Sequence, residues 1–324
     1  MSEIVWAPDV VEESVLLAER RLPPADARAF RRQRDRIYRE LEPDRREVRF
    51  QTLHLEWFRR LRLAAILEQT IEAHGAVLQR VRGCAVARAR SNREAGADLV
   101  DASQAGSDTD RRPMLLLQVM PAALLDPAAL AGWLQHELMH VSDMLDPAFG
   151  YQRTLPSSPD DPVAGNIVRD RYRVLWDVSI DGRLARAGRD IGAKRAVRAF
   201  EFAATFRMLG DRLPEVFDDW FDRVQPTHGR ILAVAGNPGG RPVDAGRCPV
   251  CRLPTGAPFD SAAGLTAPVE ALVRANHPGW RAEHGLCLQC RDLYEARHAD
   301  FARARGLHDA GRLEVAAPHP IPIE

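Results

Sequence analysis

Residues 133–147, WLQHELMHVSDMLDP, decide how the fold is interpreted, because they contain an HExxH pattern formed by His136, Glu137 and His140. On a helix, residues four apart lie on one face, one turn apart. Both imidazoles can therefore reach a single zinc ion, and Glu137 can take a proton from zinc-bound water. The pattern predicts a helix with a hydrolytic zinc site. The alternative is a helix whose two histidines only form side-chain hydrogen bonds.

The flanking sequence supports a helix with defined ends. Asp126 and Pro127 form a good N-cap and first-turn pair, and Pro147 predicts the end of the helix because the residue before a proline avoids the α region. The apolar stretch that precedes the helix is typical of a strand, and such a strand could hold an extended peptide by strand addition. We expect strands at residues 84–90, 97–101 and 113–121, with a loop over residues 102–110.

At this point the chain resembles the zincin metallopeptidases, in which a strand precedes an HExxH helix. Residues 175–188, LWDVSIDGRLARAG, also resemble the WxxAxDxxIN helix of a group of bacterial metallopeptidases. Trp176, Ser179 and Asp181 fall on its W, A and D positions, with serine in place of alanine. The resemblance covers roughly residues 84–210 and implies a zinc-peptidase fold more firmly than any substrate.

Four aspartates are candidates to complete the ligand set of the histidine site. Asp181 ranks first, because it matches the aspartate of the resembled family and would reach the ion from the next helix. Asp146 is the alternative, since it stands where a metzincin-like HExxHxxGxxD pattern places its third ligand, although Asp143 occupies the position of the glycine. We expect Asp143 and Asp177 to support the ligands through hydrogen bonds.

A second group of metal-binding residues lies near the C-terminus. Cys248 and Cys251 form one CxxC pair, and Cys287 and Cys290 form another at the start of an expected helix. Four thiolates at this spacing predict a closed tetrahedral structural zinc site, and the module resembles a treble clef or zinc ribbon. The fifth cysteine, Cys84, begins an expected strand and is best explained as a small buried apolar residue.

Composition and charge indicate which cellular compartment and which classes of partner to expect. The chain has 324 residues, of which 45% are hydrophobic and 28% charged, and its formal net charge is zero. These values are typical of a soluble globular protein and do not indicate nucleic acid as a partner, although a local basic patch is not excluded. We find no signal peptide and no apolar run of the ~18–20 residues that span a membrane. We therefore expect a cytoplasmic protein without membrane contact.

The expected fold class is α+β and mainly helical, with a zincin-like core made of a short sheet and the HExxH helix. The expected domains are an N-terminal helical region (1–82), a metal-site domain (83–235), a linker (236–247) and a zinc module with a tail (248–324). Amphipathic periodicity predicts these helical stretches: residues 9–42, broken at LPPAD; 47–81 as one long pattern; 167–187; 193–209; and 214–224.

Two functions follow from these patterns. The first is a zinc-dependent metallopeptidase that acts on a peptide or protein substrate, with one catalytic and one structural zinc ion, Glu137 as general base, and Tyr151 or Tyr172 as candidates for stabilising the oxyanion. The second is a non-catalytic interaction protein that binds protein or nucleic acid through its cysteine module. SprT-like proteins resemble this architecture, but they use a third histidine soon after HExxH, and none occurs here between His140 and His228.

Overall fold

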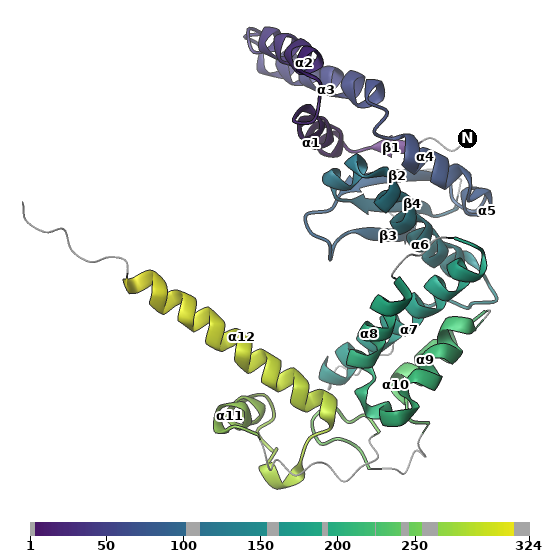
Figure 1. The fold of residues 1–324 in the computed structure, drawn as a ribbon, viewed down its shortest axis with the longest axis vertical. Helices are drawn as coiled ribbons and strands as arrows, with labels where there is room; N and C mark the ends of the chain where they lie inside the picture. Colours follow the sequence, from purple (N-terminus) through teal and green to yellow (C-terminus); the bar gives the residue numbers. More distant parts are fainter. Residues whose placement is uncertain are drawn as a thin grey trace, which may run out of the picture. The chain divides into compact units, whose positions relative to one another are not determined.

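The computed structural model describes residues 4–101, 111–153, 162–189, 194–223, 225–240, 246–254 and 265–313. These residues form a mainly helical structure with one small sheet, as the α+β class predicts (Figure 1). The chain divides into a first unit, Met1–Tyr151 with Leu184–Gly192, and a second unit, Gln152–Arg183 with Ala193–Glu324. The stretch 83–235, expected to form one domain, contributes to both units. The expected loop at 102–110, residues 241–245 of the linker and the final tail from 314 lie outside the described residues.

The sheet of the first unit has four strands in the order β1-β2-β4-β3. The central pair β2 and β4 is parallel, β1 adds in parallel beside β2, and β3 lies antiparallel at the edge beside β4. The three expected strands are confirmed, whereas β1 was not expected because three residues carry too little periodicity to predict a strand. The strands are β1 Ile4–Trp6, β2 Gly83–Arg88, β3 Gly96–Val100 and β4 Met114–Val119.

The helices of the first unit pack an apolar core with the sheet. The break at LPPAD is confirmed, but the long pattern over 47–81 is divided into three helices. Arg62 has a left-handed φ of 54°, which ends the helical path before Leu67 and Ile71 enter the core. The helices are α1 Pro8–Glu19, α2 Pro24–Ile37, α3 Pro43–Arg60, α4 Ala65–Glu72, α5 Gly75–Leu78 and α6 Pro127–Leu145.

Cys84 confirms its expected role as a core residue. It lies on β2 and is fully buried. Burial raises the pKa of its thiol to about 12, so the side chain stays neutral and behaves as a small apolar group. Around it, alternate residues of β4 point into the same core, namely Leu115, Leu117 and Val119.

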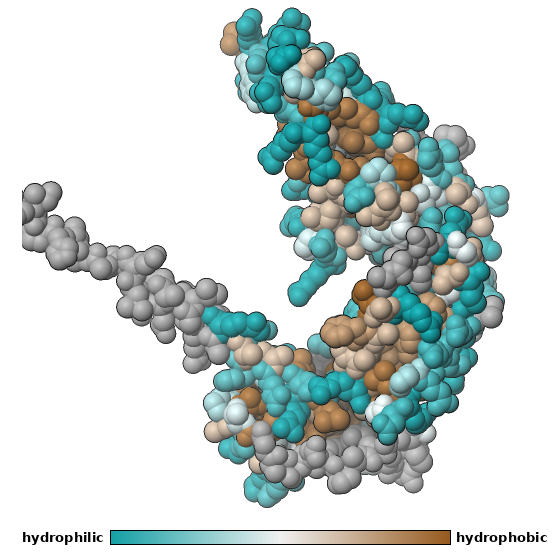
Figure 2. All heavy atoms as spheres, viewed as in Figure 1, coloured by the Kyte–Doolittle hydropathy of each residue, from teal (hydrophilic) through white to brown (hydrophobic). Residues whose placement is uncertain are grey.

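The second unit is built on helices, and three of the expected helical stretches are confirmed here. Gly182 on α7 lies against the backbone of α9, where a β-carbon would stand 1.7 Å from the carbonyl oxygen of Phe221. Figure 2 shows apolar side chains gathered over α8, where Val197 and Phe200 are exposed. The helices are α7 Pro162–Arg186, α8 Lys194–Thr205, α9 Leu213–Asp222, α10 His228–Gly236, α11 Ala267–Asn276 and α12 Leu288–Leu313.

Among the described residues, no helix is both long enough and apolar enough to cross a lipid bilayer.

Candidate metal centres

Helix α6 positions the HExxH residues, and its ends are those that the sequence predicts. The side chain of Asp126 accepts a hydrogen bond from the N–H of Ala129 at 3.1 Å, with Pro127 at the first helical position. The helix ends at Leu145, and the following Asp146 has an extended backbone before Pro147. A helix capped at its start and stopped by proline holds its central turns firmly, and His136 and His140 lie in those turns.

The two histidines direct their outer ring nitrogens toward each other. The Nε2 atoms of His136 and His140 are 3.1 Å apart, and His136 is buried. A tetrahedral zinc ion with Zn–N bonds of about 2.0–2.1 Å places two ligand nitrogens about 3.3 Å apart. The observed spacing therefore fits two ligands of one ion with little adjustment. It also fits a hydrogen bond between two neutral rings, which is the alternative given by the sequence.

Glu137 is held by the edge strand of the sheet. Its Oε2 accepts a hydrogen bond from the backbone N–H of Ala97 on β3 at 3.1 Å. Helix α6 and strand β3 are also in direct contact. Glu137 is half-buried, and this hydrogen bond holds its carboxylate at the sheet edge. A general base that is not itself a metal ligand can occupy such a position.

The candidate carboxylates have different surroundings. His136, His140 and Asp177 each offer one ligand atom, and these three atoms lie within 4.8 Å of one another. Asp181 is fully buried and forms an ion pair with Arg198, whose Nε is 2.7 Å from its Oδ2. Asp177 also contacts Arg198, at 3.4 Å. The identity of the third ligand stays a prediction, and these contacts favour Asp177 for that position and Asp181 for its support.

Arg198 on α8 links the two aspartates. Burial opposes the charge of its guanidinium, but the carboxylates of Asp177 and Asp181 outweigh burial and raise the pKa of Arg198. The guanidinium also donates to Glu201 at 2.7 Å. Arg198 thus fixes the carboxylates on one face of α7. The sequence alone does not indicate this, because Arg198 comes from another helix and belongs to no recognisable motif.

The other candidate ligands and the two candidate tyrosines lie in different surroundings. Asp143 is buried on α6, whereas the side chain of Asp146 accepts a hydrogen bond from the N–H of Ala148 at 2.9 Å and so stabilises the turn that follows the helix. The hydroxyl of Tyr172 is 2.7 Å from Nδ1 of His228 in the buried interior of the second unit. That contact gives the Tyr172 hydroxyl a structural role. Tyr151 is half-buried, and its catalytic role stays a prediction.

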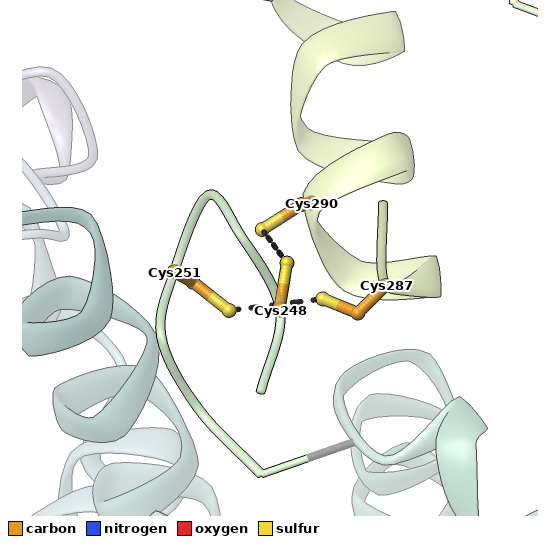
Figure 3. Close-up of side chains that lie close together, drawn as sticks. All are labelled: Cys248, Cys251, Cys287 and Cys290. Carbon is orange, nitrogen blue, oxygen red and sulfur yellow. Dashed lines mark hydrogen bonds between the residues drawn. The ribbon is translucent and has the colours of Figure 1, made fainter. Parts of the chain in front are cut away.

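The four cysteines of the C-terminal module come together as a cluster (Figure 3). Their sulfur atoms lie within 4.8 Å of one another, with Cys248 and Cys290 separated by 3.9 Å and Cys251 and Cys287 by 3.8 Å. These distances exclude a disulfide, in which the sulfurs are about 2.05 Å apart. They match the spacing of about 3.8 Å expected for a tetrahedral ion with Zn–S bonds of about 2.3 Å.

The two cysteine pairs come from different local structures. The first pair lies in a tight turn, in which the N–H of Arg252 donates to the carbonyl of Cys248 at 2.8 Å. Cys287 immediately precedes α12 and Cys290 lies in its first turn, as the sequence predicts. Hydrogen bonding with Cys248 raises the pKa values of Cys251 and Cys290. Four thiolates at this spacing would repel one another, and a metal ion bound between them would offset that repulsion, so the cluster is suited to hold a metal ion.

Arg171 on α7 places a buried positive charge near the cluster. Its guanidinium donates to the carbonyl of Ala235 at 3.2 Å and to Oε1 of Gln289, which stands between Cys287 and Cys290. Burial lowers the pKa of Arg171, and the charges of three cysteines, Cys251 among them, act against that effect. A single arginine in a helix gives no signal of this contact in the sequence.

The apolar core of the cysteine module includes a residue of helix α7. Ile167, one turn before Arg171 on α7, is buried with Trp280, Leu286 and Tyr294. The module is therefore not built from residues after 247 alone, and its packing depends on α7.

No family model, curated protein or solved structure matches the chain in the three comparisons made. The resemblance to zinc peptidases thus depends on the HExxH residues and the helix around Asp181, and the structure adds two groups of residues suited to metal binding.

Proposed function

We propose that the protein is a zinc-dependent hydrolase of peptide bonds, in which His136, His140 and Asp177 hold the ion and Glu137 is the general base. The observation that carries this proposal is the 3.1 Å convergence of the two Nε2 atoms on a helix whose intervening glutamate contacts the sheet edge. Two imidazoles and one carboxylate are a ligand set found in catalytic zinc sites, which keep one position open.

Each residue of the proposed site has a defined task. A bound zinc ion would polarise the scissile carbonyl and lower the pKa of a water molecule to about 7. Glu137 removes a proton from that water and then delivers it to the leaving amine. The Ala97 amide, which holds Oε2, leaves Oε1 to carry the proton. Arg198 keeps Asp177 charged and oriented, which a ligand carboxylate requires.

A peptide is the substrate class that suits the surrounding structure. Strand β3 is the edge of the sheet and is antiparallel to β4. An extended peptide can add to such an edge through main-chain hydrogen bonds. Because Glu137 contacts β3 at Ala97, a peptide bound along this edge would pass close to the base.

Metal analysis combined with a peptide-cleavage assay tests the proposal. The purified protein should contain two zinc ions per chain, and His136→Ala should contain one. Glu137→Gln should keep both ions, since glutamate is not a ligand, yet lose about 10²–10⁴-fold in cleavage rate. The cleavage of a mixed peptide library, followed by mass spectrometry, provides the readout. Full cleavage by Glu137→Gln, or none by the wild type, would exclude the proposed reaction.

A non-catalytic interaction protein is the second candidate function. The observation that favours it is a basic hollow in the cysteine module, which has no part in the proposed hydrolysis. A wild-type protein that carries both metal ions and cleaves no peptide would support this second function.

A further inference from the structure

A cavity of about 570 Å³ lies in the second unit beside the turn that carries the first cysteine pair. This volume is within the range of about 300–1,000 Å³ that is usual for small-molecule sites. The wall combines basic and polar side chains with one aromatic ring. The lining residues include Arg247, Arg252, His277, Trp280 and His284.

Arg252 occupies a backbone position that favours glycine. Its φ is 57°, in the left-handed region, where a β-carbon crowds the following carbonyl oxygen. Two hydrogen bonds close the turn around this residue. The N–H of Cys248 donates to the carbonyl of Leu253, and the N–H of Arg252 donates to the carbonyl of Cys248, so the turn needs this backbone conformation. Glycine would satisfy the turn without strain. The presence of arginine therefore has to be explained by its side chain.

The side chains of the wall offer positive charge without a matching carboxylate. Among the described residues, the lining of the cavity contains no aspartate or glutamate, and the guanidinium of Arg252 has no acidic partner. Arg247 is held nearby, since its Nη1 donates to the carbonyl of Arg252 at 3.0 Å. Two arginines thus face one hollow with charge left unneutralised, a favourable setting for an anion.

His284 adds a neutral donor to these charges. Its Nδ1 accepts a hydrogen bond from the N–H of Arg281 at 3.1 Å. The proton of the neutral ring is consequently on Nε2, which becomes a donor. Trp280, which also lines the hollow, is buried, and its indole N–H donates to the carbonyl of Gly285 at 2.9 Å, which holds the ring in place. His277 closes the wall, with its Nε2 buried.

We propose that this hollow binds a phosphate group, with Arg247 and Arg252 as charge partners and Nε2 of His284 as a third donor. Three separate donor groups match the several oxygens of a phosphate better than the two oxygens of a carboxylate. The volume exceeds that of phosphate alone, so the hollow also accommodates the group that carries it. That carrier is either a small phosphate ester or the backbone of a single-stranded nucleic acid. The proposal does not depend on peptide hydrolysis.

The binding experiment uses the full chain with its metal ions and three probes at low salt: inorganic phosphate, adenosine monophosphate, and a single-stranded oligothymidylate of about ten nucleotides, a length within the site size of small binding modules. Isothermal titration gives the affinities. Binding of the mononucleotide identifies a small phosphate ester, whereas binding of the oligonucleotide alone identifies a nucleic-acid backbone. Either result supports the phosphate site, and failure of all three probes to bind overturns it.

Arg252→Gly separates binding from folding. The substitution relieves the strained φ, so the midpoint of thermal unfolding should stay the same or rise, while affinity for the bound probe should fall about tenfold or more through loss of a charge-assisted contact. Arg62→Gly is the matched control, because Arg62 has a φ of 54° and lies in the first unit. It should keep the wild-type affinity. Equal affinity of Arg252→Gly and the wild type would contradict the proposal.

Discussion

The backbone N–H of Ala97, on the edge strand β3, donates a hydrogen bond of 3.1 Å to Oε2 of Glu137, the glutamate of the HExxH pattern on α6. Ala97 is paired with Leu117 of β4 in the register of the sheet, yet its amide is directed to Glu137. The strand thereby fixes the carboxylate of the proposed base without any other side chain. This contact explains how a half-buried glutamate on α6 can be both accessible and oriented.

Replacement of Ala97 by proline tests the importance of this orientation. Proline removes the amide donor and is tolerated on edge strands. We expect Ala97→Pro to keep both metal ions and to lower kcat about 10–100-fold, in the range found when a group that orients an active-site residue is lost. Steady-state cleavage of a peptide measures kcat and KM separately. Ala97→Gly keeps the amide and should retain kcat. A wild-type kcat in the proline variant would show that Glu137 does not need this contact.

Local patterns could be predicted from the sequence because nearby residues determine them. The cap at Asp126, the stop at Pro147 and the helix that begins after Cys287 depend on residues within one turn. The break at Arg62 could not be predicted, since apolar spacing continues through it and only packing of the next helix against the core explains it.

The sequence ranks Asp181 before Asp177 as the third ligand, but for a related reason it does not show the contacts of either side chain. Both lie on one face of α7, separated by one turn. The contacts that distinguish them come from α8, through Arg198, and from the histidines of α6. Similarly, the part that Arg171 plays near the cysteines depends on a contact with Gln289, more than a hundred residues away. Spacing within a motif carries no information on such contacts.

Asparagine substitutions distinguish the two aspartates. Asp177→Asn should lower zinc affinity at the histidine site by at least about tenfold, because a neutral amide is a poor substitute for a carboxylate ligand. Asp181→Asn should mainly lower stability, since it leaves the charge of Arg198 poorly paired beside a buried group, at a cost of about 3–5 kcal/mol if the pair is fully broken. Chelator competition and thermal unfolding provide the two readouts. The reverse pattern would restore Asp181 as the ligand.

Loss of one thiolate should affect the cysteine module selectively. Cys248→Ser should reduce the zinc content from two ions to one and expose residues after about 246 to limited proteolysis, because structural zinc contributes directly to the folding of small modules. Cys84→Ala is the control, since Cys84 is fully buried on β2 and belongs to neither metal group. It should keep both ions. An unchanged zinc content in Cys248→Ser would show that the four sulfurs do not bind the metal.

Arg171 should stabilise the metal-loaded form of the cysteine cluster by its charge. Four thiolates and one divalent ion carry a net charge of −2, and a buried guanidinium reduces the cost of placing that charge in the interior. Arg171→Met retains the length of the side chain but not its charge or its hydrogen bonds to Ala235 and Gln289. We expect its cysteine site to lose metal to a chelator about 10–100-fold more readily, as when groups that support metal ligands are removed.

Arg173→Met provides the matched control for that experiment. Arg173 lies on the same helix, but its side chain is 56% exposed and pairs with Asp177 and Glu201 instead of approaching the cysteines. Its removal should leave metal release from the cysteine site at the wild-type rate. Release can be followed separately at this site through the thiols that become reactive to a disulfide reagent. If both methionine variants release the metal at the same rate, the charge of Arg171 does not stabilise the cluster, and its contacts with Ala235 and Gln289 only join α7 to the module.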